Sequence, residues 1–103
     1  TDVPTIEHIL PQKQPNFGYW ATEFSEAEHD KLKDLWANLV PLSGPMNSSV
    51  GQEDYQKKRA RYTKESMYAS TRQVSESFQE WTPESIKQRG AKLADWAIQR
   101  WPH

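Results

Sequence analysis

The stretch NLVPLSGPMN, residues 38–47, decides the fold that we expect for this chain. Residues 38–42 are predicted to form a short strand, and Ser43-Gly44-Pro45 has the composition of a turn. Asn47-Ser48-Ser49 then opens a helix or a single helical turn. The two asparagines, Asn38 and Asn47, are nine residues apart and lie on either side of this strand-to-helix turn.

A second short segment, Ile6-Glu7-His8-Ile9-Leu10-Pro11, lies near the start of the chain. Residues 5–10 alternate weakly and are predicted to form a strand that Pro11 ends. Successive side chains on a strand point to opposite faces, so Glu7 and His8 share a site only if the strand twists or ends there. A two-stranded antiparallel hairpin followed by a helix would gather Glu7, His8 and Asn47 around one cleft.

Several helices are expected around this hairpin. Ser25 and Glu28 fit a capping box that opens a helix from Glu26 to about Ala37, with Leu32, Leu35 and Trp36 as its apolar stripe. Residues 11–19 are predicted to form a loop. Further helices are expected over residues 53–65, 71–79 and 83–101, the last beginning behind an N-cap at Thr82 and ending at Pro102.

Two aromatic residues of the last helix, Trp96 and Trp101, are expected to pack over the hairpin, because two strands alone are not stable in water. His29 lies in a charged helix and is predicted to be a surface residue, and His103 is terminal. Neither histidine is predicted to take part in a site.

The bulk composition bounds the class of protein. A chain of 103 residues suits a single domain, and five Trp, four Tyr and three Phe provide large apolar surfaces for a small core. No stretch approaches the roughly 20 apolar residues of a membrane span. The absence of Cys excludes disulfides and thiolate zinc sites and fits a cytoplasmic location. No signal peptide or initial Met is present, so we expect a piece of a larger protein.

The charge pattern leaves two interpretations open. The net charge is −1, whereas a nucleic-acid-binding domain is usually basic. Residues 57–72 nevertheless carry six basic side chains against Glu65 alone. These side chains form either a phosphate-facing surface or a solvated helix face. Candidate DNA contacts are Lys57, Lys58, Arg61 and Arg89, although Arg89 could equally reach a carboxylate.

The residue types near the two short segments suit phosphodiester hydrolysis. A histidine can take the proton from a nucleophilic water. A hard divalent cation can neutralise charge on the phosphate and stabilise the leaving oxygen. Since Mg²⁺ keeps several waters, the carboxylate of Glu7 and the amide oxygen of Asn47 could suffice as its protein ligands.

The order of these residues resembles that of HNH-type nucleases. In that family an acidic residue and a histidine end the first strand, an Asn-Leu-x-x-Leu follows, and a His or Asn stands nine positions after that Asn. The resemblance implies that His8 is the general base, that Glu7 and Asn47 bind Mg²⁺ or Mn²⁺, and that Asn38 braces the loop bearing the base. Asn at the last position is similar to the HNH domains of CRISPR effector nucleases.

Two positions depart from the commoner HNH pattern. Glu7 stands where Asp is usual, which lengthens the ligand by one methylene. Many HNH domains also bind a structural zinc through Cys-x-x-Cys pairs, but Ser43 and Met46 stand at the equivalent places, so no structural zinc is expected.

A narrower resemblance covers nearly the whole chain in order. The segments at residues 6–12, 38–39 and 46–49, the helix with Lys57-Lys58, Trp81-Thr82-Pro83 and Trp101-Pro102 look like the C-terminal domain of GmrSD-type modification-dependent restriction proteins. The resemblance implies DNA as substrate and a role in restriction of modified or phage DNA. It also implies a preceding, ParB-like nucleotide-using domain in the same or a partner chain, and no membrane.

The expected fold is therefore α+β, a ββα-metal (His-Me finger) core in one domain over residues 1–103, wrapped by further helices. The expected function is a metal-dependent DNA endonuclease. Two alternatives remain open: a non-catalytic DNA- or protein-binding module that keeps the HNH fold, and a purely structural helical cap in which Glu7 and His8 are ordinary polar residues.

Overall fold

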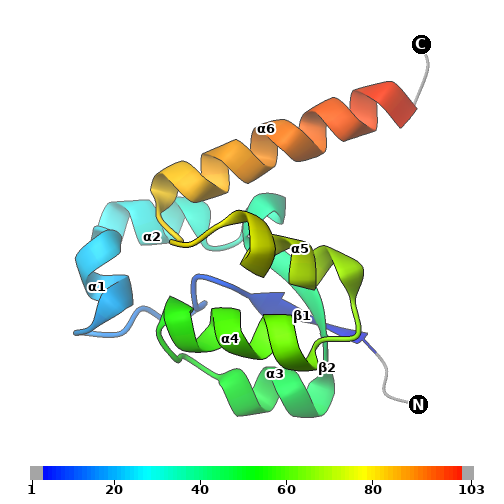
Figure 1. Cartoon of the computed structure of the whole chain (residues 1–103). Coiled ribbons are helices and arrows are strands. Elements are labelled where there is room, and N and C mark those ends of the chain that lie inside the picture. The colour runs from blue at the N-terminus through cyan, green and yellow to red at the C-terminus, as the bar shows by residue number, and fades with distance from the viewer. Residues whose placement is uncertain (1–3, 101–103) are drawn as a thin grey trace.

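A computed structural model describes residues 4–100 and has a two-stranded sheet at its centre (Figure 1). Strand β1 (Pro4–His8) pairs antiparallel with β2 (Leu39–Ser43), in a register that runs from Pro4 opposite Ser43 to His8 opposite Leu39. This confirms the predicted α+β class and the hairpin. The first strand ends two residues earlier than predicted, because Ile9 and Leu10 leave the ladder and are fully buried in the core.

Helices lie above and below the two strands in the view of Figure 1. Their bounds are α1 Tyr19–Glu23, α2 Glu26–Leu32, the 3-10 turn η1 Trp36–Asn38, α3 Gly44–Val50, α4 Tyr55–Glu65, α5 Ala69–Ser77 and α6 Pro83–Arg100. The short helix α1 begins at the end of the predicted loop and was not expected. Among residues 4–100, no helix combines the length and the apolar character that crossing a membrane requires.

Helix α3 follows β2 without an intervening loop. The Ser43 hydroxyl caps it by accepting from the Met46 backbone N–H at 3.3 Å, and Pro45 lies in the first turn, where its missing N–H costs nothing. The helix therefore begins three residues before the predicted start at Asn47. Asn47 consequently lies inside the helix and faces β1.

The helix that begins at the Ser25–Glu28 capping box is shorter than predicted. Both reciprocal hydrogen bonds of the box form, but α2 ends at Leu32 rather than at Ala37. The side chain of Asn38 donates to the Lys33 carbonyl at 2.8 Å, and this satisfies one of the carbonyls that the helix end leaves without a partner. Leu35 and Trp36 are consequently 46% and 61% exposed, so the predicted apolar stripe is wrong at both positions.

The core is built from aromatic residues of several elements. Trp20, Tyr55, Tyr62 and Trp81 are all fully buried, together with aliphatic residues from β2 and the segment after β1. Thr82 caps α6, since its hydroxyl accepts from the Ser85 N–H at 3.3 Å. The far half of α6 extends away from the body of the molecule in Figure 1, and Trp96 is 48% exposed. Trp96, which was predicted to pack over the hairpin, lines a groove together with Leu39 and Pro41 of β2. Trp101, Pro102 and His103 lie outside the described residues.

Candidate functional site

His8 is the last residue of β1 and is half-buried, with 22% of its side chain exposed. Its Nε2 lies 3.0 Å from Oδ1 of Asp34, a residue of the loop between α2 and η1. This hydrogen bond holds the pKa of the exposed Asp34 carboxyl below its ordinary value, and the nearby Lys33 ammonium acts in the same direction. A neutral imidazole that donates from Nε2 carries its lone pair on Nδ1, for which residues 4–100 provide no hydrogen-bond donor.

Glu7 precedes His8 and is only 3% exposed. Its Oε2 accepts from the Lys58 ammonium at 3.0 Å and from the Tyr62 hydroxyl at 2.6 Å, both on α4. Burial raises the pKa of the Glu7 carboxyl, although the bonds from Lys58 and Tyr62 oppose that rise. Burial likewise lowers the pKa of the Lys58 ammonium. The other oxygen, Oε1, accepts no hydrogen bond within the described part of the chain.

Asn38 is completely buried and uses its whole side chain in hydrogen bonds. Its Oδ1 accepts from the Leu10 N–H at 2.8 Å and from Nε1 of Trp81 at 2.9 Å. Its Nδ2 donates to the carbonyls of Leu10 and Lys33, at 3.0 and 2.8 Å. Asn38 thus ties the segment just after His8 to the end of α2 and to the core, with no atom left over for a ligand.

Asn47 reaches from α3 to β1, where its Nδ2 donates to the Thr5 hydroxyl and to the Ile6 carbonyl, at 2.9 Å each. This leaves its Oδ1 as a free acceptor among residues 4–100. Thr5 and Glu7 are two apart on a strand and share one face, whereas His8 points to the other. The structure therefore brings Asn47 and Glu7 to one face of β1, with His8 at the end of the strand on the opposite face.

The four basic residues predicted to contact DNA differ in their surroundings. Lys57 is exposed, but Lys58 is completely buried with its ammonium on Glu7, so the predicted DNA contact is wrong for Lys58. Arg61 is partly exposed and is bonded to Glu65 and to the Ser49 hydroxyl. The Arg89 guanidinium donates to the carbonyls of Ala37 and Leu39, at 2.8 and 3.0 Å, and burial lowers its pKa.

A groove lies between β2, α5 and α6, on the face of the hairpin to which His8 points. Leu39, the register partner of His8, is one of its lining residues. Trp36 and Trp96 also line it, as do Arg89 and Lys92, and no carboxylate belongs to this lining within the described residues. The groove is therefore aromatic and basic, and the register places His8 beside one of its walls.

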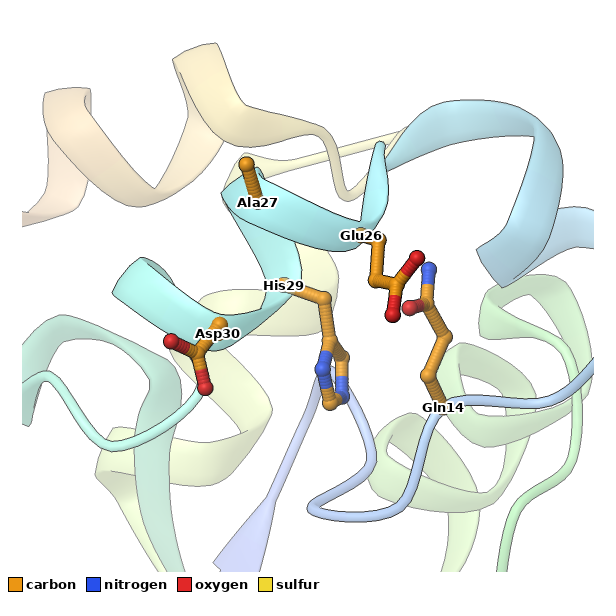
Figure 2. A pocket seen from close by; sticks show the side chains of 5 residues that line it. All are labelled: Gln14, Glu26, Ala27, His29 and Asp30. Carbon is orange, nitrogen blue, oxygen red and sulfur yellow. The ribbon is translucent and has the colours of Figure 1, made fainter.

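A second hollow lies at α2 and is lined by Gln14, Glu26, Ala27, His29 and Asp30 (Figure 2). His29 is buried rather than exposed as predicted, because its Nε2 bonds to the Pro11 carbonyl at 2.7 Å. This bond fixes the loop after β1 to α2. Within residues 4–100, no group of three or more His, Cys, Asp or Glu side chains is placed to hold a metal ion.

Sequence reasoning missed the partners of the two key side chains. No role was predicted for Asp34, Tyr62 was not linked to Glu7, and Lys58 was predicted to contact DNA. Asp34 is 26 residues from His8 in the sequence, and Lys58 and Tyr62 are 51 and 55 residues from Glu7, so no local motif links these pairs. An apolar spacing signal did exist for Tyr62, which shares a face of α4 with the buried Tyr55.

Comparison with known proteins gives one family. Neither the curated proteins nor the solved structures contain a match to this chain. A family model described as "GmrSD restriction endonucleases, C-terminal domain" matches residues 1–96, which is nearly the whole sequence. The chain therefore belongs to the family of C-terminal domains of GmrSD restriction endonucleases.

Proposed function

We propose that this domain is a Mg²⁺- or Mn²⁺-dependent DNA endonuclease that hydrolyses phosphodiester bonds in the restriction of modified or phage DNA. Family membership implies a role related to restriction endonucleases, with DNA as substrate. The observation that carries the catalytic proposal is the environment of His8. It stands at a strand end, with one ring nitrogen bonded to Asp34 and the other without a hydrogen-bond partner among residues 4–100.

In the proposed reaction His8 is the general base. The Asp34 carboxylate accepts a hydrogen bond from the His8 Nε2–H and so favours the tautomer whose Nδ1 can take a proton from water. The water oxygen then bonds to phosphorus, the bond to the leaving 3′ oxygen breaks, and that oxygen acquires a proton from solvent. Asn38 keeps the segment after His8 in place while this happens, through its two bonds to Leu10.

The residues near β1 fit a single hard cation in their donor type. Oε1 of Glu7 and Oδ1 of Asn47 are oxygens without hydrogen bonds among residues 4–100, and they lie on one face of the strand. Such an ion takes few protein ligands because it retains water. When bound, it would neutralise phosphate charge and stabilise the leaving oxygen.

DNA would approach the end of β1, where 22% of the His8 side chain is exposed. Lys57 and Arg61 on α4 remain proposed phosphate contacts, whereas the Arg89 guanidinium is engaged with two carbonyls. We further propose that residues 1–103 act as one C-terminal nuclease domain in the cytoplasm. A ParB-like nucleotide-using domain would act with it in the same or a partner chain.

The second candidate is a non-catalytic binding module, and one observation favours it. The Glu7 carboxylate is already compensated by Lys58, so a metal ion would have to bind beside a buried ammonium group. The aromatic and basic groove between α5 and α6 would then provide the binding surface.

Titration with Mn²⁺ separates these two functions. We expect Glu7→Gln and Asn47→Ala to weaken Mn²⁺ binding measured by electron paramagnetic resonance. Asn16→Ala should leave the affinity unchanged, since Asn16 is an exposed loop residue of the same type. Equal affinity in the wild type and all three variants would remove the metal site and favour the binding module.

A further inference from the structure

The side chain of Lys58 is the most completely engaged cation in the described part of the chain. It is 0% exposed, and a lysine is almost never fully buried unless its charge is paired. Its three N–H groups have three acceptors: Oε2 of Glu7 at 3.0 Å, the His8 carbonyl at 2.9 Å and the Ile9 carbonyl at 3.0 Å. An ammonium has only three donors, so none remains for a DNA phosphate.

These acceptors belong to three consecutive residues, Glu7, His8 and Ile9, which form the end of β1 and the first residue beyond it. A single ammonium group therefore fixes the backbone on either side of the His8–Ile9 peptide bond. The ring of the proposed base is attached to that backbone, and its direction depends on it. Tyr62, one helical turn after Lys58, adds a bond to the same oxygen of Glu7.

The same contacts fix the orientation of the Glu7 carboxylate. Lys58 and Tyr62 both bind Oε2, which leaves Oε1 as the oxygen without a hydrogen bond within residues 4–100. Lys58 is 0% exposed, so it acts only on the groups packed around it: Glu7, the two carbonyls and the Trp20 ring, whose centroid lies 5.8 Å from Nζ.

We propose that Lys58 is a positioning residue of the nuclease site, which holds the His8 backbone and presents a single carboxylate oxygen of Glu7. This inference rests on the proposed function, because it requires His8 and Glu7 to be the working groups. It differs from the ordinary role of a basic residue in a DNA-binding protein, since Lys58 contributes nothing to DNA affinity.

The test compares Lys58→Met with Lys57→Met, its exposed neighbour on α4. In plasmid nicking with Mg²⁺, we expect Lys58→Met to lower kcat by about 10- to 100-fold, the usual range for a residue that orients a metal ligand. KM and its salt dependence should stay at the wild-type values. Lys57→Met should instead raise KM and reduce the salt dependence, as a phosphate contact does.

A second readout uses the metal-free protein without DNA. The His8 ring signals in the NMR spectrum, assigned by their loss in His8→Ala, should shift in Lys58→Met and stay in place in Lys57→Met. If the wild type does not nick DNA but these signals shift, the proposed function fails while the positioning of His8 stands. Unshifted His8 signals in a folded Lys58→Met protein would overturn the inference.

Tyr62→Phe serves if Lys58→Met does not fold, because it removes only the hydroxyl bound to Oε2 and keeps the buried ring. We expect a smaller loss of kcat with KM unchanged, and weaker Mn²⁺ binding than in the wild type. A rise in KM with kcat unchanged, in either variant, would contradict a positioning role. Lys58→Arg should restore part of the lost kcat if the positive charge on Glu7 is what matters.

Discussion

At the residue scale, the proposed chemistry depends on one histidine and the groups that fix it. His8 has a carboxylate on Nε2, a clamped backbone carbonyl and an adjacent segment held by a buried asparagine. The proposed roles of His8 and Asn38 come from the resemblance to HNH nucleases and from the nine-residue spacing of Asn38 and Asn47, and they remain predictions. The partner Asp34 could not be predicted, because an exposed aspartate in a charged loop has no local feature that sets it apart.

The His8–Asp34 contact predicts the titration of Asp34. Its pKa lies below the ordinary 3.8 mainly because His8 hydrogen-bonds to the ionised form. A lowered pKa in the folded state means that the contact stabilises the fold above pH 3.8 and that this contribution is lost as the pH falls through the lowered pKa. We expect His8→Ala to raise the Asp34 pKa toward 3.8, as followed by the carboxyl ¹³C shift in NMR.

Replacing His29 by Gln is the control for that titration, because His29 bonds to the Pro11 carbonyl rather than to Asp34. This variant should leave the Asp34 pKa where it is in the wild type. An Asp34 pKa that does not move in His8→Ala would mean that the two side chains do not interact in solution.

Glu7 and Lys58 lie on the strand and the helix that the sequence predicts. The sequence did not predict that the two side chains form a buried ion pair. Lys58 stands in a run of basic residues, where a solvated or DNA-facing side chain is the usual outcome. Its burial follows from a carboxylate 51 positions away, which compensates the charge inside the core. Removing one partner of such a buried pair costs about 3–5 kcal/mol, so the pair also contributes to the integrity of the fold.

At the element scale, local signals predicted where elements begin better than where they end. The capping residues Ser25 and Thr82 open their helices as expected. The ends of β1 and α2 were predicted too late, because both depend on the Asn38 region: its carbonyl accepts from the Ile9 N–H, and its side chain binds the Lys33 carbonyl. The residues that these contacts join are too far apart in sequence for helical or strand periodicity to predict them.

The capping box gives a prediction at this scale. Ser25→Ala removes the acceptor for the Glu28 N–H, and we expect it to lower the free energy of unfolding by about 1 kcal/mol. Urea denaturation followed by circular dichroism measures this change. Ser48→Ala is the matched control, since Ser48 is an exposed residue within α3 and alanine favours helices. Equal losses in both variants would show that the box contributes nothing specific.

At the scale of the whole molecule, a very small sheet is stabilised by an aromatic core from the helices. The two strands bury Val40 and Leu42, and Trp20, Tyr55, Tyr62 and Trp81 complete that core. The number of large aromatic residues made a packed domain predictable from composition. Which tryptophans would be buried was not predictable: Trp20 and Trp81 are inside, while Trp36 and Trp96 line an open groove.

The packing of the whole chain also determines which residues of the proposed site lie together. The fold brings Asn47 and Glu7 to one face of β1 and leaves His8 at the strand end on the opposite face, whereas the order of the segments led us to expect all three around one cleft. Sequence spacing could place these residues on their elements. It could not show that Glu7 would be held by α4, because that depends on how a distant helix packs against the hairpin.

The most direct test of the central claim is plasmid nicking with Mg²⁺ by the wild type, His8→Ala and His29→Gln. If His8 is the base, His8→Ala should nick about 10²- to 10⁴-fold more slowly, while His29→Gln, which keeps a donor for the Pro11 carbonyl and has no proposed role in the reaction, should keep the wild-type rate. Circular dichroism would establish that all three proteins are folded. Nicking by His8→Ala at the wild-type rate would contradict the account.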